Sequence, residues 1–530
     1  MRPHWVWLFV GLAAVAAEGD RFPQARENAR LAAEGLDRCR RYVDGWLAQA
    51  DPASGLIPRN LDASRDLWNA QDAAADNYPF MVLTCALVDR PRFEGRMRGM
   101  LRAESRLTAR LGRLPDAYRF STRAFASPQV DLEAILFGGS EYVKDGLLPL
   151  TEWLGPSPWS ERMLGIVDDL WKHAPVSTPY GRIVSDNVEV NGDLLQVLSR
   201  LYWMTGRARY LEWATRLGDY HLLGDHHPTR DLRVLRLRDH GCEIVSGLCE
   251  LYATVHFANP AKKEAYRQPL HEMLDRILAV GRNEHGLFYD QIDPVTGQPT
   301  RGGAGVADTW GYTLNAFYTV YLLEGTAAYR AATRQALSVL WEHYRNFAWE
   351  GSSADGYADS IESALNLHNR EPIESCARWI DSEIQVMWAK QRPDGIIEGW
   401  HGDGNFARTT VMYALWKTQG VTLRPWRADV RLGAVKEGDD LYLSLTADRP
   451  WSGRLIFDSP RHRTAMRLPL DYPRINQFPE WFTVEAKQRY RVEDLVQGTA
   501  STHSGKRLQA GLSLRVTPAA GQRLRVGPQR

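Results

Sequence analysis

The chain repeats one pattern several times: a loop ends at an acidic residue, and a mostly apolar segment of helical spacing follows. In 305–325 (GVADTWGYTLNAFYTVYLLEG), Asp308 stands where a helix N-cap is expected, because its carboxylate can accept from the first free amides. The same arrangement recurs at Asp76, Asp186, Asp239, Asp359 and Asp403. The closer members of this series are 53, 51 and 44 residues apart, which fits one helical hairpin per repeat. We therefore expect a mainly α protein built as an (α/α) toroid of six or seven hairpins, with the inner helices beginning at one polar rim.

Composition fits a folded protein and excludes some partners. Apolar residues make up 44% and charged residues 24% of the 530 residues, as in ordinary globular proteins. The formal net charge of +1 provides no overall field for nucleic acid or an anionic membrane. The 19 Trp and 21 Tyr suit stacking on sugar rings, although filling the core is the alternative for each of them.

The first 17 residues have the layout of a secretory signal peptide. An apolar run follows Arg2, and small residues at Ala14, Ala16 and Ala17 precede a cleavage site. We expect export to the periplasm or the outside of the cell, with no membrane contact after cleavage.

The cysteines and histidines indicate no metal site. The five cysteines are scattered and odd in number, which favours free buried thiols. The histidine-rich loop at 221–240 lacks the spacing of a zinc site. We expect neither a metal nor a cofactor.

The pattern changes near residue 424. From Pro425, short runs of β-forming residues alternate with turn residues, which predicts a small β-sandwich-like domain over 424–530 after a helical domain over 18–423. The conspicuous polar and aromatic stretch 460–482 (PRHRTAMRLPLDYPRINQFPEWF) is expected to pack against the helical ring, with carbohydrate binding as the alternative.

A ring of helical hairpins with carboxylates at the inner-helix starts and a terminal β domain resembles the (α/α) toroid carbohydrate-active enzymes. These include six-hairpin glycosidases, among them glucuronyl hydrolases, and toroid polysaccharide lyases. The resemblance covers nearly the whole mature chain as architecture and transfers no catalytic residues. It implies a saccharide-binding cleft at one end of the ring and, as partner, an oligo- or polysaccharide of plant or microbial origin.

Glycoside hydrolysis needs one carboxylic acid and one carboxylate. The predicted pair is Asp308 with Glu243, on consecutive inner helices, although any single aspartate could be a helix cap instead. Basic groups on the same rim would suit a uronic acid, so a β-glucuronidase-like uronidase is the specific hypothesis. The predicted substrate-binding residues are Asp76, Asn77, Tyr78, Lys144, Asp186, Asn187, Glu189, His240, Trp310, Tyr312, Asp359, Trp400, His401, Asp403 and Arg408.

Two alternatives remain open. A polysaccharide lyase would use Tyr312, Tyr78, His240 or His401 as the base and Arg408 to neutralise the uronate. A non-enzymatic glycan-binding protein would have an aromatic cleft without paired carboxylates.

Overall fold

The computed structural model describes residues 21–518 and 520–529. The segment predicted as a signal peptide lies outside the described residues. Within the described ranges, no helix is both long enough and apolar enough to cross a membrane.

Seven inner helices form a closed ring in the described part of the chain. Each packs against the next, and the last returns to the first. Two of them contain a π-helical turn. In ring order they are η1–α2 (Ala70–Asn77, Tyr78–Val88), α5–η3–α6 (Leu132–Glu141, Tyr142–Leu147, Leu148–Leu154), α8 (Val188–Thr205), α10 (Glu243–Ala258), α12 (Trp310–Glu324), α14 (Ala354–His368) and α16 (Asn405–Lys417).

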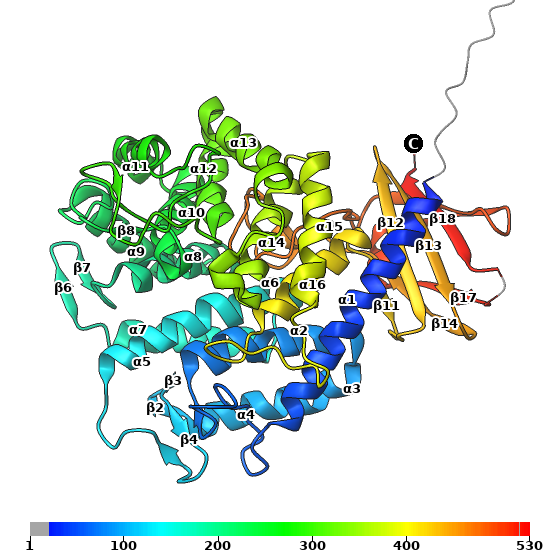
Figure 1. Ribbon diagram of the computed structural model, residues 1–530, viewed down its shortest axis with the longest axis horizontal. Helices are drawn as coiled ribbons and strands as arrows, with labels where there is room; N and C mark the ends of the chain where they lie inside the picture. The colour runs from blue at the N-terminus through cyan, green and yellow to red at the C-terminus, as the bar shows by residue number, and fades with distance from the viewer. Residues whose placement is uncertain (1–20, 519, 530) are drawn as a thin grey trace, which may run out of the picture.

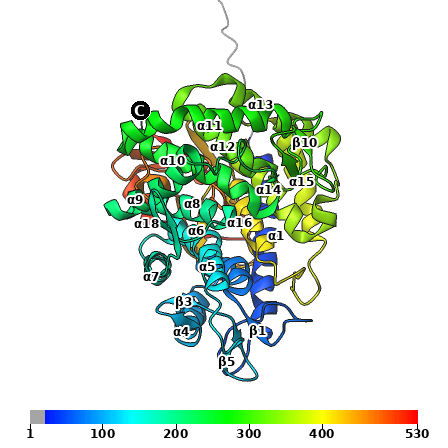
Figure 2. The same ribbon diagram turned by 90° about the vertical axis from the view of Figure 1, so that its left-hand side faces the viewer.

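An outer helix accompanies each inner helix. In Figure 2 the labels of the outer helices α4, α7, α9, α11, α13 and α15 lie towards the edge, and those of the inner helices α8, α12, α14 and α16 lie nearer the centre. The predicted toroid is thus confirmed, with seven hairpins in the described residues. The outer helices are α1 (Phe22–Ala48), α3–η2–α4 (Arg90–Arg92, Phe93–Met97, Arg98–Leu107), α7 (Pro158–Lys172), α9 (Ala208–Gly218), α11 (Pro260–Val280), α13 (Ala327–His343) and α15 (Glu374–Trp388).

Glycines set the close approach of α8 and α10. A Cβ at Gly192 would lie 2.4 Å from backbone atoms of Glu243 and Ile244, and one at Gly247 would lie 2.6 Å from the carbonyl oxygen of Gly192. No side chain fits at these distances, so the two helices can touch backbone to backbone only with glycine at both positions.

Most of the repeated aspartates are not helix caps, which corrects the sequence interpretation. Two helices begin earlier than expected, because Asn69 caps η1 and Ser353 caps α14. Helix α8 begins one residue later than expected, with Asn187 instead of Asp186 as its cap. Asp76 and Asp359 therefore lie inside their helices, with carboxylates not used for capping. Asp403 comes closest to the expected role, since its Oδ1 accepts from the amide of Phe406 at 3.4 Å.

The loops between the ring helices contain short strands and helical turns. Their bounds are β1 (Leu67–Trp68), β4 (Tyr118–Arg119) and β5 (Ala124–Phe125) in one sheet; β2 (Ala109–Leu111) with β3 (Leu114–Pro115); β6 (Val176–Thr178) with β7 (Gly181–Ile183); β8 (Leu235–Arg236), β9 (Gln291–Asp293) and β10 (Gln298–Pro299) in another sheet; and the helical turns η4 (Asp219–Leu223), η5 (Asp239–Cys242) and η6 (Trp349–Ser352).

Two antiparallel sheets follow the ring and share an apolar core. A Cβ at Gly433 of β12 would lie 2.1 Å from the amide nitrogen of Ala29, so this strand lies directly on α1. The five-stranded sheet has the order β12 (Val430–Glu437), β13 (Asp440–Ala447), β18 (Gln522–Pro528), β15 (Arg489–Asp494), β16 (Thr499–Ser504), and the three-stranded sheet β11 (Thr422–Arg424), β14 (Trp451–Ile456), β17 (Leu512–Val516). Two short helices accompany them, α17 (Arg461–Thr464) and α18 (Gly505–Ala510).

Residues 461–482, here called the inserted segment, leave the β region after β14 and enter the helical ring (Figure 1, orange). The apolar side chains of Met466, Leu468, Tyr472 and Phe478 belong to the same core as the ring helices. The expected packing of this segment against the ring is confirmed, and the segment goes deeper than a surface contact would.

Candidate functional site

One cavity of about 400 Å³ opens among the inner helices. Its wall is strongly acidic and is built from first turns of inner helices, from the π-helical turns η1 and η3, from the loops before the inner helices and from the inserted segment. The lining residues are Arg59, Gln71, Asp72, Asp76, Phe137, Glu141, Lys144, Asp145, Asp239, His240, Glu243, Thr309, Tyr312, Glu350, Asp355, Asp359, Trp400, His401, Asn405, Arg408 and Asn476.

Many of the residues predicted for the site line this cavity. They are Glu243, Asp76, Lys144, His240, Tyr312, Asp359, Trp400, His401 and Arg408. Glu189 stands behind this wall, with its Oε1 3.8 Å from His240 Nδ1.

The other predicted residues do not line the cavity. Tyr78 is buried between Met97 and Trp159, and Trp310 is buried against Ser360. Asn77 accepts a hydrogen bond from Tyr42, and Asp403 is buried at the start of α16. Asp186 and Asn187 are exposed before α8. Successive residues on a helix point about 100° apart, so neighbours of a cavity residue commonly face the core or the outside.

The predicted catalytic pair does not meet in the cavity. Asp308 is buried, and its Oδ1 accepts from the amide of Thr309 at 2.9 Å; Thr309, not Asp308, lines the wall. Burial raises the pKa of Asp308 well above its usual value, and the nearby Asp359 adds to this. Glu243 does line the cavity, but its carboxylate accepts hydrogen bonds from the ammonium of Lys144 and from the side-chain amide of Gln196.

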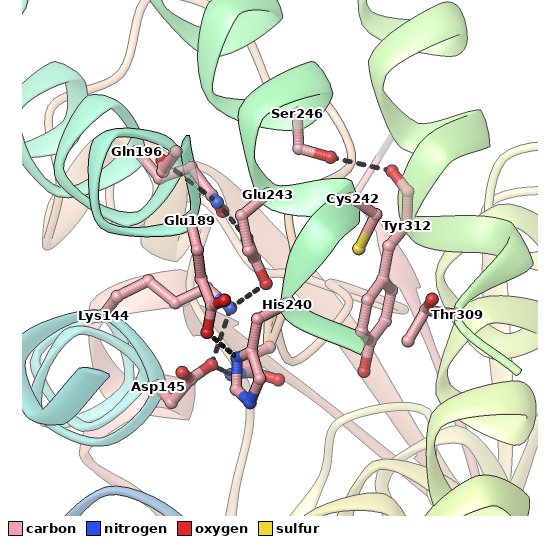
Figure 3. A network of polar contacts seen from close by, with 12 residues as sticks. Lys144, Asp145, Glu189, Gln196, His240, Cys242, Glu243, Ser246, Thr309 and Tyr312 are labelled. Carbon is pink, nitrogen blue, oxygen red and sulfur yellow. Dashed lines mark hydrogen bonds and ion pairs between the residues drawn. The ribbon is translucent and has the colours of Figure 1, made fainter. Parts of the chain in front are cut away.

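The first charged cluster surrounds Lys144 on η3 (Figure 3). Its ammonium pairs with Asp145 at 2.7 Å and with Glu243. Burial alone would lower the pKa of Lys144, but these two carboxylates outweigh it and raise the pKa well above its usual value. His240 lies beside them, with Nδ1 3.2 Å from Glu141 Oε2.

His240 is held in its charged form. Burial opposes this, but Asp239, Asp145 and Glu189 raise the pKa of His240 to about 10. The ring is therefore protonated at neutral pH and serves as a cation among the carboxylates.

The second cluster joins α12, α14 and α16. The guanidinium of Arg408 pairs with Asp359 and, at 2.7 Å, with Glu362. The hydroxyl of Tyr312 lies 3.0 Å from a carboxylate oxygen of each of these two acids. One turn before Asp359, the carboxyl of Asp355 accepts a hydrogen bond from the side-chain amide of Asn405 at 2.7 Å, its only hydrogen bond among the described residues.

Asp355 and Asp359 have opposite electrostatic surroundings although both line the cavity. Burial raises the pKa of Asp355 well above its usual value, and the neighbouring carboxylates Asp359, Asp403 and Glu350 raise it further. Asp359 has the Arg408 guanidinium as its direct partner. The protonated form of one carboxyl is thus favoured beside a second carboxyl that is ion-paired.

The third cluster flanks the mouth of the cavity. Arg59 pairs with Asp72, and His401 Nε2 lies 3.6 Å from Asp76 Oδ2. Burial raises the pKa of Asp76 to about 7, against the opposing charge of His401. Trp400 is 78% exposed and stacks on Arg59, with 5.0 Å from the guanidinium carbon to the ring centre.

Three groups of side chains in the described ranges bring carboxylates and a histidine close enough to hold a cation. They are Asp72, Asp76 and His401; Glu141, Asp145 and His240; and His462, Asp471 and Glu480. In the second group the protonated imidazole has no lone pair to donate, and Lys144 already neutralises Asp145. In the first group, Arg59 neutralises Asp72. The donor sets at the cavity therefore fit internal ion pairs better than a metal.

Sequence reasoning missed several cavity residues. Asp355 had a usable signal, because residues four apart on a helix share a face and Asp359 was already a candidate. Asn405 likewise stands one turn before Arg408. Asn476 lies in the polar stretch 460–482 that was expected to pack against the ring, but no local pattern shows which of its residues reaches the cavity. The residues not predicted as site residues are Arg59, Gln71, Asp72, Phe137, Glu141, Asp145, Asp239, Thr309, Glu350, Asp355, Asn405 and Asn476.

Comparison with known proteins gives likenesses of structure only. No protein-family model matches the chain, and no curated protein sequence matches it. A family 76 α-1,6-mannanase from a Salegentibacter species, solved as an inactive variant with α-1,6-mannotetrose, has a TM-score of 0.42 at 9% identity, covering 72% of this chain and 98% of its own. A family 76 mannosidase from Bacteroides thetaiotaomicron has a TM-score of 0.38 at 11% identity, covering 72% and 99%.

A family 127 β-arabinofuranosidase covers 96% of this chain and 78% of its own, with a TM-score of 0.38 at 11% identity. These similar structures are carbohydrate-active proteins, the class that the sequence pattern resembles. At such scores the activity of this chain has to be argued from its own cavity.

Proposed function

We propose that this protein is a glycoside hydrolase whose general acid is Asp355 and whose charged carboxylate is Asp359. The observation that carries the proposal is that these two carboxyls lie in one cavity with different neighbours: Asp355 is surrounded by other carboxylates, whereas Asp359 is paired with the guanidinium of Arg408. Glycosidases need a pair of carboxyl groups in different protonation states, and such a difference arises from unequal surroundings.

Each group has a defined role in the proposed reaction. Asp355 donates its proton to the glycosidic oxygen as the bond to the anomeric carbon breaks. Asp359, oriented by Arg408 and Tyr312, attacks or stabilises the anomeric carbon, and water completes the hydrolysis. Helix residues four apart have Cβ atoms about 5–6 Å apart, so both carboxyl groups can reach one sugar unit. Retaining enzymes have the two carboxyls roughly 5–5.5 Å apart and inverting enzymes roughly 6.5–9.5 Å apart, so the configuration of the first product distinguishes attack by Asp359 from attack by water.

The cavity suits a neutral sugar better than the uronate first expected. Every cationic group on its wall, within the described residues, already has a carboxylate partner: Arg59 with Asp72, Lys144 with Asp145 and Glu243, His240 with Glu141, His401 with Asp76, and Arg408 with Asp359 and Glu362. A uronate would enter a cavity with more acids than free cations and would be repelled. Trp400 offers an exposed ring face at the mouth for a sugar unit.

The surroundings of the candidate bases speak against a lyase. Burial raises the pKa of Tyr312 well above its usual value, and Asp359 and Glu362 add to this against the effect of Arg408. His240 and His401 both have raised pKa values because adjacent carboxylates outweigh burial. Tyr78 is in the core. None of these four groups is suited to taking a proton from a sugar carbon at neutral pH.

The test is a panel of neutral oligosaccharides and aryl glycosides, followed by release of reducing ends. Asp359→Asn should abolish turnover. Asp355→Asn should lose about 10²- to 10⁴-fold on alkyl-type leaving groups, the usual contribution of general acid catalysis, and much less on aryl glycosides whose phenol needs no proton. Asp186→Asn, on the exposed residue before α8, is the matched control and should behave as wild type. Equal loss on both leaving groups in Asp355→Asn would refute its role as the acid.

We also propose that the enzyme acts outside the cytoplasm. The support is the N-terminal pattern of a charged residue, an apolar run and small residues. N-terminal sequencing of the protein recovered from the medium or periplasm would test this, and an uncleaved cytoplasmic product would refute it.

A further inference from the structure

The inserted segment is anchored deep in the ring by buried charges. The Arg474 guanidinium pairs with Glu152 of α6 at 2.6 Å, and the Tyr472 hydroxyl donates to Glu250 of α10 at 3.2 Å. Arg474 is almost completely buried. These contacts fix the segment inside the ring, because Glu152 lies in the last turn of α6 and Glu250 in the middle of α10.

Asn476, two residues beyond Arg474, forms part of the cavity wall. Its side-chain amide donates to Asp145 at 2.8 Å, and its side-chain oxygen accepts from Arg408 at 2.9 Å. Its backbone amide donates to Glu362 at 2.7 Å. The residue is only 2% exposed, so these contacts are shielded from bulk water.

These contacts span the ring. Asp145 belongs to η3, whereas Glu362 and Arg408 belong to α14 and α16, which are not neighbours of η3 in the ring. Asn476 is therefore a bridge between two acidic clusters of the cavity. Without it, the carboxylate of Asp145 and the guanidinium of Arg408 would each lose a partner from the middle of the ring.

Asparagine fits this position for two reasons. One side chain has to donate to a carboxylate and accept from a guanidinium, which an amide does and a carboxylate does not. The backbone has a φ of 59°, in the left-handed region that asparagine tolerates better than most residues.

We propose that Asn476 is a positioning residue of the active site, and that the C-terminal β region thereby completes the cavity of the ring. The inference rests on the proposed hydrolase function: Asn476 fixes Arg408, which in turn holds Asp359 in place for reaction. The β region is then a part of the enzyme rather than an accessory module.

Asn476→Gly is the informative variant, because glycine removes both side-chain contacts and adopts the left-handed backbone without strain. Asn346→Gly is the matched control, since Asn346 is exposed, lies outside the cavity and has a similar φ of 53°. We expect Asn476→Gly to lower kcat by roughly 10- to 100-fold, the scale of lost hydrogen bonds to charged groups, with a small change in KM. The control should keep the wild-type kcat.

A second variant separates positioning from folding. Asn476→Asp keeps the acceptor for Arg408 but places a new carboxylate beside Asp145, which already faces Lys144, His240 and Glu141. The acid limb of the kcat profile should therefore move to higher pH, which a merely structural role would not cause. A wild-type kcat in Asn476→Gly would overturn the inference. So would a loss of activity in Asn476→Gly that only matches the loss of folded protein, together with an unchanged pH profile in Asn476→Asp.

Failure of the proposed function gives a different pattern. If wild type cleaves none of the sugars, the hydrolase proposal falls, and the placement of Asn476 is judged by thermal unfolding alone. A buried carboxylate at 476 beside Asp145 should destabilise Asn476→Asp more at pH 8 than at pH 5, because its folded pKa would be raised. A pH-independent difference in Tm from wild type would overturn that placement.

Discussion

Removal of the Arg474 guanidinium should strongly destabilise the protein. Arg474→Met keeps most of the side-chain volume but leaves Glu152 with Arg200 as its nearest remaining cation, at 4.0 Å instead of 2.6 Å. Breaking a buried ion pair by removing one partner costs about 3–5 kcal/mol, because the other charge stays buried without compensation. Arg474 also donates to the backbone oxygen of Tyr472 at 2.6 Å, so we expect a loss of about 4 kcal/mol.

A double-mutant cycle tests the cause of this loss. Glu152→Gln combined with Arg474→Met removes the orphaned charge, so the double variant should be more stable than the sum of the single losses by about 1–3 kcal/mol. Urea unfolding followed by both tryptophan fluorescence and circular dichroism measures the free energies and shows whether the ring and the β region unfold together. A loss below about 1 kcal/mol in Arg474→Met, or additive single losses, would refute the reasoning.

The same pair has a pH signature. Burial would raise the pKa of Glu152, but Arg474 and Arg200 outweigh it and hold the pKa below the usual 4.5. A folded pKa below the unfolded value contributes stability above the unfolded pKa and loses it as the pH falls. The difference in unfolding free energy between wild type and Arg474→Met should therefore shrink below about pH 4.5. A constant difference down to pH 3 would contradict this.

Three further predictions follow from the cavity and the ring. Trp400→Ala should raise KM about 2- to 10-fold with kcat nearly unchanged, because its exposed ring contributes binding but no chemistry; an unchanged KM would remove Trp400 from the site. Gly192→Ala should lower the free energy of unfolding by about 1–3 kcal/mol or more, since its Cβ would lie 2.4 Å from the backbone of α10. The control Gly95→Ala, whose Cβ would have no atom within 4 Å, should be neutral or slightly stabilising, and equal Tm values for the two variants would contradict the close packing. Burial raises the pKa of Asp76 to about 7, so the contribution of this carboxyl to stability falls as the pH rises towards 7. The Tm of wild type should therefore fall more than the Tm of Asp76→Asn over this pH range, and parallel Tm profiles would refute the prediction.

Periodicity in the sequence was sufficient to predict the ring, because each inner helix repeats an apolar segment after a polar loop. It was less informative about single side chains. Tyr78 follows Asp76 by two residues but points to the core, since two helical steps rotate a side chain by about 200°. Asp355 and Asp359 were separable from capping residues only once the start of α14 was known.

Some of the site could not be predicted from local sequence at all. Asn476 reaches the cavity because Arg474 and Tyr472 find buried carboxylates on α6 and α10, which are hundreds of residues away in the chain. The protonation of His240 depends likewise on Asp145, which belongs to another hairpin. Such properties arise from charges that only the closed ring brings together.

The most direct test of the central claim is the chemistry of the bond cleaved. Wild-type protein is incubated with a neutral oligosaccharide in water enriched in heavy oxygen, and the products are examined by mass spectrometry. Hydrolysis in the cavity predicts one heavy oxygen in each new reducing end, and none with Asp359→Asn. Products that lack the label and are lighter by one water would show elimination instead, and intact substrate would contradict the assignment of a hydrolase.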